Sequence, residues 1–150
     1  ACWSQTEAAP YLHLARAFQA VEMTTKRLRI ADVLINTFRS LMALAPEDVL
    51  AAAYLTINKL RPDHEGVELS VGGSTVSQAI TEATGVSRSR LRELYRTLGD
   101  LGDVAQSCHR SQRLLVAPRP LSISKVYTTL LKIASESGAG CASRKQALVL

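Results

Sequence analysis

The chain has 150 residues, of which 47% are hydrophobic and only 5% aromatic, and its formal net charge at pH 7 is +5. A chain of this length can bury a core, and this hydrophobic content excludes wholesale disorder. The excess of basic residues suits a polyanionic partner, although many basic proteins bind none.

Apolar residues recur at helical spacing through most of the chain, and the low aromatic content also favours helices over sheets. The predicted helices are 10–23, 26–42, 45–60, 74–84, 87–98, 102–108 and 122–137, with a further helix beginning near 144. Ser87 is suited to cap its helix, while Gly85 and Gly99 are suited to end theirs. Residues 61–73 are expected to form a loop, in which alternating valine and leucine residues can adopt a short extended stretch.

These segments predict an all-α fold, an irregular bundle of about seven or eight helices joined by short loops. We interpret residues 1–150 as one domain or part of one. The terminus Leu148-Val149-Leu150 is unusually apolar for the end of a complete domain, so we expect the chain to be a fragment.

The cysteines Cys2, Cys108 and Cys141 lie far apart and form no Cys-x-x-Cys pair. This spacing supports neither a zinc site nor a disulfide framework, and reduced structural thiols are expected. No apolar run approaches membrane-spanning length, and the first residues do not resemble a signal peptide. The sequence therefore favours a soluble intracellular protein without a membrane partner.

Motifs that carry catalytic chemistry are missing from the sequence. No lysine is followed by x-Asp-Gly, the setting of a nucleotidyl-transfer lysine, and neither GxxxxGK[ST] nor GxGxxG occurs. His64-Glu65 resembles the start of a zinc-binding helix, but Glu68 stands where the second histidine should be. We therefore expect no catalytic residue, no metal site and no cofactor in this chain.

Basic residues concentrate in four runs near predicted loops or helix ends. They are "TTKRLR" at 24–29, "RSRLRELYR" at 88–96, "HRSQRLLVAPR" at 109–119 and "RK" at 144–145. Any single run is adequately explained as a solvated helix face. Together they favour an anionic partner, because basic side chains, threonine hydroxyls and free N–H groups at a helix start can hold a phosphate. The apolar residues within and after the first run, Leu28, Ile30, Val33 and Leu34, are assigned to the core.

Residues 75–99 have the pattern of a helix-turn-helix, with a Thr-Gly-Val-Ser turn and an arginine-rich second helix. In a transcription regulator that second helix would enter the major groove of DNA and read bases. The segment lacks the Asn or Gln often used to recognise adenine, although its arginines are suited to guanine. A regulator therefore stands as an alternative, and a helical protein-interaction domain without any nucleic-acid role is a third hypothesis.

A second resemblance runs through almost the whole chain. The segments that carry it, in order, are "ACW" (1–3), "PYLHLARAFQAVEMTTKRLRIADVLINTFRSL" (10–41), "PEDVLAAAYLTINKLRPDHEGVELSVG" (46–72), "VSQAITEATGVS" (76–87), "GDLGDVA" (99–105), "SQRLL" (111–115), "PLSISKVYTTLLKIASESGAG" (120–140) and "SRKQALVL" (143–150). They resemble the N-terminal DNA-binding domain of ATP-dependent DNA ligases of the eukaryotic DNA ligase I type, in truncated form.

The resemblance implies a helical domain that binds duplex or nicked DNA, independently of sequence, through phosphate and minor-groove contacts. It further implies a nuclear enzyme of DNA replication, repair and recombination, in which separate adenylation and OB-fold domains, with ATP and Mg²⁺, seal the nick. A DNA-contacting Gly-Lys-Leu-Arg-x-Gly loop of that family is absent from this chain. Ser70 also stands where the family usually has Gly, and Ala45 replaces a helix-capping Ser.

The same resemblance implies which residues contact DNA. The family's threonine/serine-x-arginine element at a helix start falls on Thr25, Lys26 and Arg27. Weaker candidates come from loops that the family places near DNA and from the third basic run. They are Ser143, Arg144, Lys145, Arg110 and Arg113.

Overall fold

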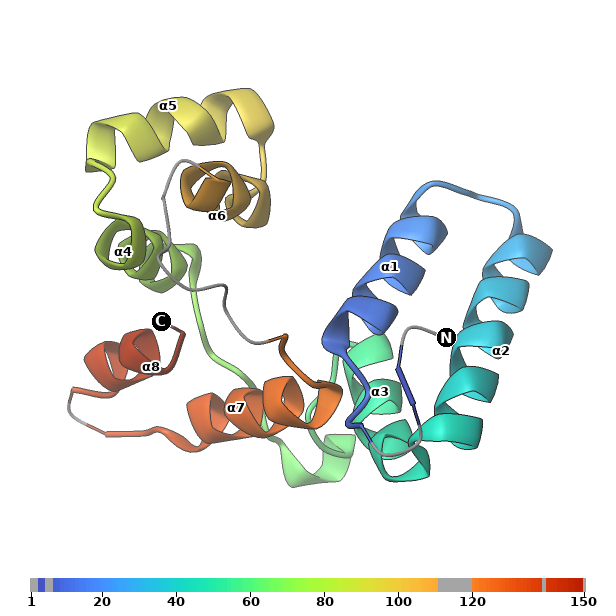
Figure 1. Ribbon diagram of the computed structural model, residues 1–150. Coiled ribbons are helices and arrows are strands. Elements are labelled where there is room, and N and C mark those ends of the chain that lie inside the picture. Colours follow the sequence, from blue (N-terminus) through green and yellow to red (C-terminus); the bar gives the residue numbers. More distant parts are fainter. Residues whose placement is uncertain (1–2, 5–6, 111–119, 139, 150) are drawn as a thin grey trace. The chain divides into compact units, whose positions relative to one another are not determined.

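The computed structural model describes residues 3–4, 7–110, 120–138 and 140–149. Over these ranges it contains eight α-helices and no strand, which confirms the predicted all-α class (Figure 1). The α-helices are α1 (Tyr11–Glu22), α2 (Arg27–Leu44), α3 (Val49–Thr56), α4 (Gly73–Thr84), α5 (Arg88–Leu98), α6 (Leu101–Arg110), α7 (Ile123–Ser135) and α8 (Cys141–Val149), with short 3₁₀ turns at Pro46–Asp48 and Asp63–Glu65. None of the helices in these ranges has the length and apolar character needed to cross a bilayer.

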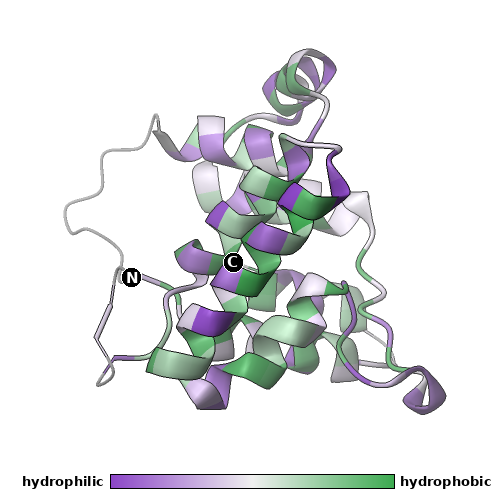
Figure 2. Ribbon diagram, turned by 90° about the vertical axis from the view of Figure 1, so that its right-hand side faces the viewer, coloured by the Kyte–Doolittle hydropathy of each residue, from purple (hydrophilic) through white to green (hydrophobic). Residues whose placement is uncertain are grey.

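The chain divides into two compact units, residues 1–68 with 118–131, and residues 69–117 with 132–150. In most helices of both units hydrophobic and hydrophilic residues are mixed along the helix, as in amphipathic helices, whereas the short α3 is almost entirely apolar (Figure 2).

In the first unit, α1 packs against α2, and their apolar faces close over the short α3. Its buried core consists of Trp3, Ala9, Leu14, Leu41, Ala45, Ala51, Ala52 and Ile123. Asp48, only 2% exposed, accepts a hydrogen bond from the N–H of Ala9 over 3.1 Å, which fixes the chain before α1 to the turn before α3. The Tyr127 hydroxyl donates to the carbonyl of Leu60 over 2.7 Å, and burial raises the pKa of Tyr127.

In the second unit, α4 packs against α6 and α8, and α5 packs against α6. Ile80, Leu91, Val104 and Cys108 form its buried core. The residues predicted to cap or end helices in this unit are confirmed. The Ser87 hydroxyl accepts from the N–H of Arg90, and Gly85 and Gly99 end their helices with φ of 69° and 78°, in the left-handed region that favours glycine.

One predicted helix boundary was wrong. The helix expected over 45–60 is a 3₁₀ turn followed by α3, which stops at Thr56, and Asn58 just beyond it has a positive φ of 55°. The expected loop before α4 is present, and within it Ser70 at φ 48° interrupts the alternation that an extended stretch needs. A left-handed Ser70 fits a position where glycine is expected.

Leu28 is the clearest error in the predicted core, since it is 83% exposed. Ile30, Val33 and Leu34 are half-buried. Leu28 lies in the first turn of α2, just after the segment that connects it to α1, and Met23 on the other side of that segment is exposed as well. The described residues of this unit therefore leave Leu28 and Met23 largely uncovered.

Candidate nucleic-acid interface

The start of α2 holds the three residues that the sequence assigns to DNA contact. Lys26 is the N-cap residue, Arg27 begins the helix, and both are exposed, as is Thr25. Neither Thr24 nor Thr25 occupies the N-cap position, and no side chain caps the helix. Thr24 Oγ1, two residues before the N-cap residue, accepts from the N–H of Lys26 over 3.3 Å.

This helix start leaves hydrogen-bond donors available. The first N–H of α2 with a partner within the described residues is that of Ile30, which donates to the Lys26 carbonyl over 3.0 Å. The N–H groups of Arg27, Leu28 and Arg29 precede it and have no intrahelical acceptor. The first turn contains no acidic residue to offset the positive end of the helix dipole. Cations, a hydroxyl and free N–H groups thus point outward from one turn, a combination suited to a phosphate.

Three other helices begin with a side-chain cap. The hydroxyl of Ser87 caps α5, the carboxylate of Asp100 accepts from two N–H groups of α6, and the hydroxyl of Ser122 accepts from Lys125 at the start of α7. In each of these three helices at least one N–H of the first turn is therefore satisfied by a side chain. The start of α2 carries basic side chains and free donors where these helices carry caps.

The second predicted group, in α8, is engaged in the fold. Arg144 donates to the carboxylate of Glu136 and, over 2.8 Å, to the carbonyl of Ser137, and the hydrogen bond from Arg144 to Glu136 raises the pKa of Arg144. Lys145 is only 6% exposed, and its Nζ donates to the carbonyl of Leu69 over 3.0 Å. That Arg144 and Lys145 contact DNA stays a prediction, and both side chains are already hydrogen-bonded within the fold. Ser143 is exposed.

The remaining predicted residues come from the third basic run. Arg110 is the last residue of α6. Arg113 lies outside the described residues. The groups at α2 and α8 belong to different units.

Residues suited to hold a metal ion do not cluster anywhere in the described ranges. The helices, the uncapped basic start of α2 and the net charge of +5 define a basic all-α module with donors directed outward. The chain belongs to the family described as "DNA ligase N terminus", whose model matches residues 10–150.

Curated relatives agree with this membership. The chain is 49% identical over 150 residues to DNA ligase 6 of Arabidopsis thaliana, a match that covers all of this chain and 11% of that protein. It is 39% identical over 145 residues to DNA ligase 1 of the same plant and 42% identical over 138 residues to DNA ligase 1 of Drosophila melanogaster. These matches cover 97% and 92% of this chain but 18% of each relative. The chain thus spans a small part of the relatives it matches.

The comparisons give no support to a transcription regulator. Residues 75–99 do form two helices, α4 and α5, with a turn between them. Both helices lie inside the segment that matches the ligase family. The helix-turn-helix pattern is therefore accounted for as an internal helix pair of a ligase N-terminal region.

Proposed function

We propose that this chain binds duplex DNA without regard to sequence and positions nicks for sealing by the catalytic domains of an ATP-dependent ligase. The observation that carries the proposal is the start of α2, where exposed Lys26 and Arg27 stand beside free N–H groups. Membership of the ligase N-terminal family supplies the reason to expect DNA as the anion.

The proposed contact works through one phosphate of the backbone. The N–H groups of the first turn of α2 donate to its oxygens, the guanidinium of Arg27 adds a charge-assisted hydrogen bond, and Lys26 adds charge. The hydroxyl of Thr25 is a further donor. Such contacts fix position on a duplex but carry no sequence information, which is what a nick-sealing enzyme requires because nicks occur in any sequence.

The catalytic chemistry is assigned to other parts of the full-length protein. In this proposal adenylation and OB-fold domains bind ATP and Mg²⁺ and join the strands, and the protein acts in the nucleus during replication and repair. The chain itself contributes binding and no catalytic residue. Ser143 and Arg144 remain candidate contacts in α8, although Arg144 also donates to Ser137, and Lys145 is the weaker candidate because its Nζ donates to the carbonyl of Leu69.

Binding to nicked, intact and unrelated-sequence duplexes tests this proposal. Similar affinities irrespective of sequence support it, while strong preference for one sequence, or no binding at low salt, contradicts it. If about three to five phosphates are contacted, the slope of log affinity against log salt should be roughly −3 to −5. An affinity that does not change with salt would rule out a phosphate-based contact.

A further inference from the structure

A groove runs between α4 and α5 in the second unit. Two adjoining hollows form it, each with a volume of about 330 Å³, and Ser77, Leu91 and Arg92 line both. Buried Leu91 forms an apolar floor. This surface shares no residue with the start of α2, which belongs to the other unit.

One wall of the groove is cationic. Arg88, Arg92 and Arg96 follow one another at four-residue spacing along α5, so they lie on one side of the helix, and all three are exposed. Within the described residues no carboxylate pairs with them, and no acidic side chain lines either hollow. The uncompensated charge of α5 therefore faces the groove.

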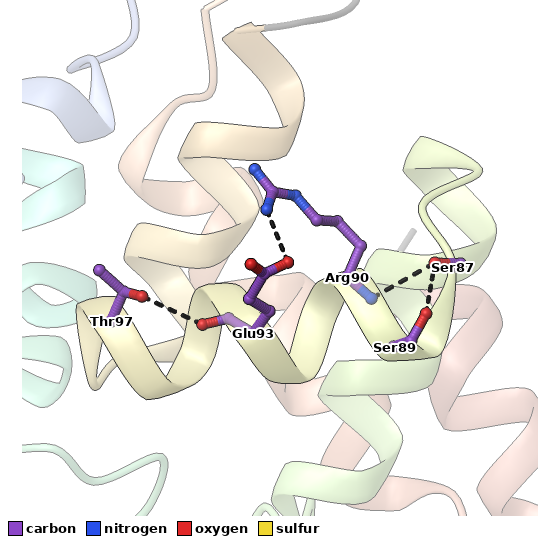
Figure 3. Close-up of polar contacts among 5 residues, drawn as sticks. All are labelled: Ser87, Ser89, Arg90, Glu93 and Thr97. Carbon is purple, nitrogen blue, oxygen red and sulfur yellow. Dashed lines mark hydrogen bonds and ion pairs between the residues drawn. The ribbon is translucent and has the colours of Figure 1, made fainter.

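The other arginine of α5 is already paired with an acidic residue (Figure 3). Arg90 donates to Glu93 over 2.7 Å, and near the start of the helix the hydroxyls of Ser87 and Ser89 lie 3.1 Å apart, one of them donating to the other. The charge of Arg90 is thus offset locally. Neighbouring like charges at four-residue spacing disfavour a helix, so the arginine row is not explained by helix stability.

The other wall of the groove presents hydrogen-bond donors. Ser74, Ser77 and Gln78 come from one side of α4, and their side chains make no hydrogen bond within the described residues. Tyr95 lines the second hollow from α5 and is 47% exposed. An aromatic ring beside a row of arginines offers a surface on which a nucleic-acid base can stack.

We propose that this α4–α5 groove binds a single strand of nucleic acid, whose backbone follows the arginine row and whose base stacks on Tyr95. Arg88 and Arg96 are eight residues apart, which is about 12 Å along a helix. A row of this length can therefore meet more than one phosphate of a single strand that follows it. Hollows of this volume hold groups of nucleotide size and are too small for a duplex.

An acidic peptide fits the groove less well. The even spacing of the three arginines suits a polymer with one charge in every repeat unit, and serine hydroxyls with guanidinium groups form a donor set typical of phosphate sites. The site is independent of the proposed duplex contact at α2, because it uses other residues in another unit.

Fluorescence anisotropy of a labelled oligothymidylate of about 12 nucleotides, titrated with the whole 150-residue chain at low salt, tests the site. Replacing both Arg92→Ala and Arg96→Ala should weaken binding about tenfold or more, since two phosphate contacts are lost. Arg90→Ala is the control for the single variant Arg92→Ala, because each removes one charge from α5 and Arg90 lies outside the arginine row, and it should leave binding within about twofold. Tyr95→Ala should weaken binding while Tyr95→Phe retains it.

Several results would overturn the proposal. The first is that the unmodified chain does not bind oligothymidylate. The second is that Arg90→Ala and the double variant lose equal affinity for it. The third is that polyglutamate displaces the labelled oligothymidylate as effectively as unlabelled oligonucleotide does. Duplex affinity of the same variants separates this site from the one at α2. Arg27→Ala should leave oligothymidylate binding unchanged. Oligothymidylate affinity therefore tests the α4–α5 groove, and duplex affinity tests the contact at α2, so one proposal can fail while the other stands. Circular dichroism checks that each variant remains helical.

Discussion

Arg27 and Lys145 both belong to short basic runs, yet they differ in solvent exposure. Arg27 is exposed at the first turn of α2, whereas the ammonium of Lys145 is buried against the carbonyl of Leu69. The sequence alone predicts solvent exposure for both, because lysine and arginine are rarely buried without a partner. The partner of Lys145 is a backbone carbonyl far away in the sequence, and no local pattern encodes that contact.

At the scale of single residues, the proposed phosphate contact at α2 leads to a prediction for Arg27. Arg27→Ala should weaken duplex binding about tenfold, equally for all duplex sequences, because one charge-assisted hydrogen bond of roughly 1.5–3 kcal/mol is lost. The slope of log affinity against log salt should become shallower by about one unit. Titrations of labelled duplexes at several salt concentrations measure both quantities.

Arg39→Ala supplies the matched control. Arg39 is exposed on the same helix, twelve residues or about 18 Å from Arg27, so the net charge changes equally while the helix start stays intact. Equal losses from the two variants would show that overall charge, and not the first turn of α2, governs binding. A double substitution of Lys26 and Arg27 without effect on affinity or salt slope would rule out this contact altogether.

For Lys145 we predict an effect on stability and none on DNA binding. Lys145→Ala removes the packing of a buried stem and the hydrogen bond to Leu69, so the free energy of unfolding should fall by about 1–3 kcal/mol. Duplex affinity, measured where both proteins are folded, should stay the same. Lys132→Ala is the control, since Lys132 is exposed. Unchanged stability with weakened DNA binding would restore Lys145 as a DNA contact.

At the scale of elements, residues with a strong local preference set the boundaries that the sequence predicts correctly. Ser87 and Gly99 delimit α5 through a cap and a left-handed turn, and both effects depend on adjacent residues only. Boundaries that depend on packing were predicted less well. The exposure of Leu28 and the early end of α3 at Thr56 are decided by which neighbouring surface is available, and helical periodicity does not contain that information.

Glycines at two helix ends should respond differently to alanine. Gly99 has φ of 78°, and a Cβ added there would meet open space, so Gly99→Ala should cost about 1 kcal/mol through backbone strain alone. Gly73 is helical, and an added Cβ would make only an ordinary 3.7 Å contact with Leu101, so Gly73→Ala should not destabilise the chain. Denaturant unfolding compares the two, and a larger loss for Gly73→Ala would contradict this account.

At the scale of the whole molecule, helical periodicity was sufficient to predict the all-α class, and the ordered run of ligase-like segments was sufficient to predict the family. The division into two compact units was not predicted, because it depends on contacts between residues distant in sequence. The arginine row of α5 was visible as a basic run. That the arginine row faces the serine hydroxyls of α4 could not be predicted, because it depends on how the two helices pack together.

The whole chain should also fail to form the covalent intermediate of a ligase. Nucleotidyl transfer from ATP requires a lysine placed to attack the α-phosphate, and none of Lys26, Lys59, Lys125, Lys132 and Lys145 is followed by x-Asp-Gly. Incubation with labelled ATP and Mg²⁺ should therefore leave no label on the denatured protein, under conditions in which an intact ATP-dependent ligase becomes labelled. Lys145 is the least accessible of these lysines, because it is only 6% exposed and its Nζ donates to the carbonyl of Leu69. A label that survives denaturation and disappears in Lys145→Ala would reverse the assignment of catalysis to other domains.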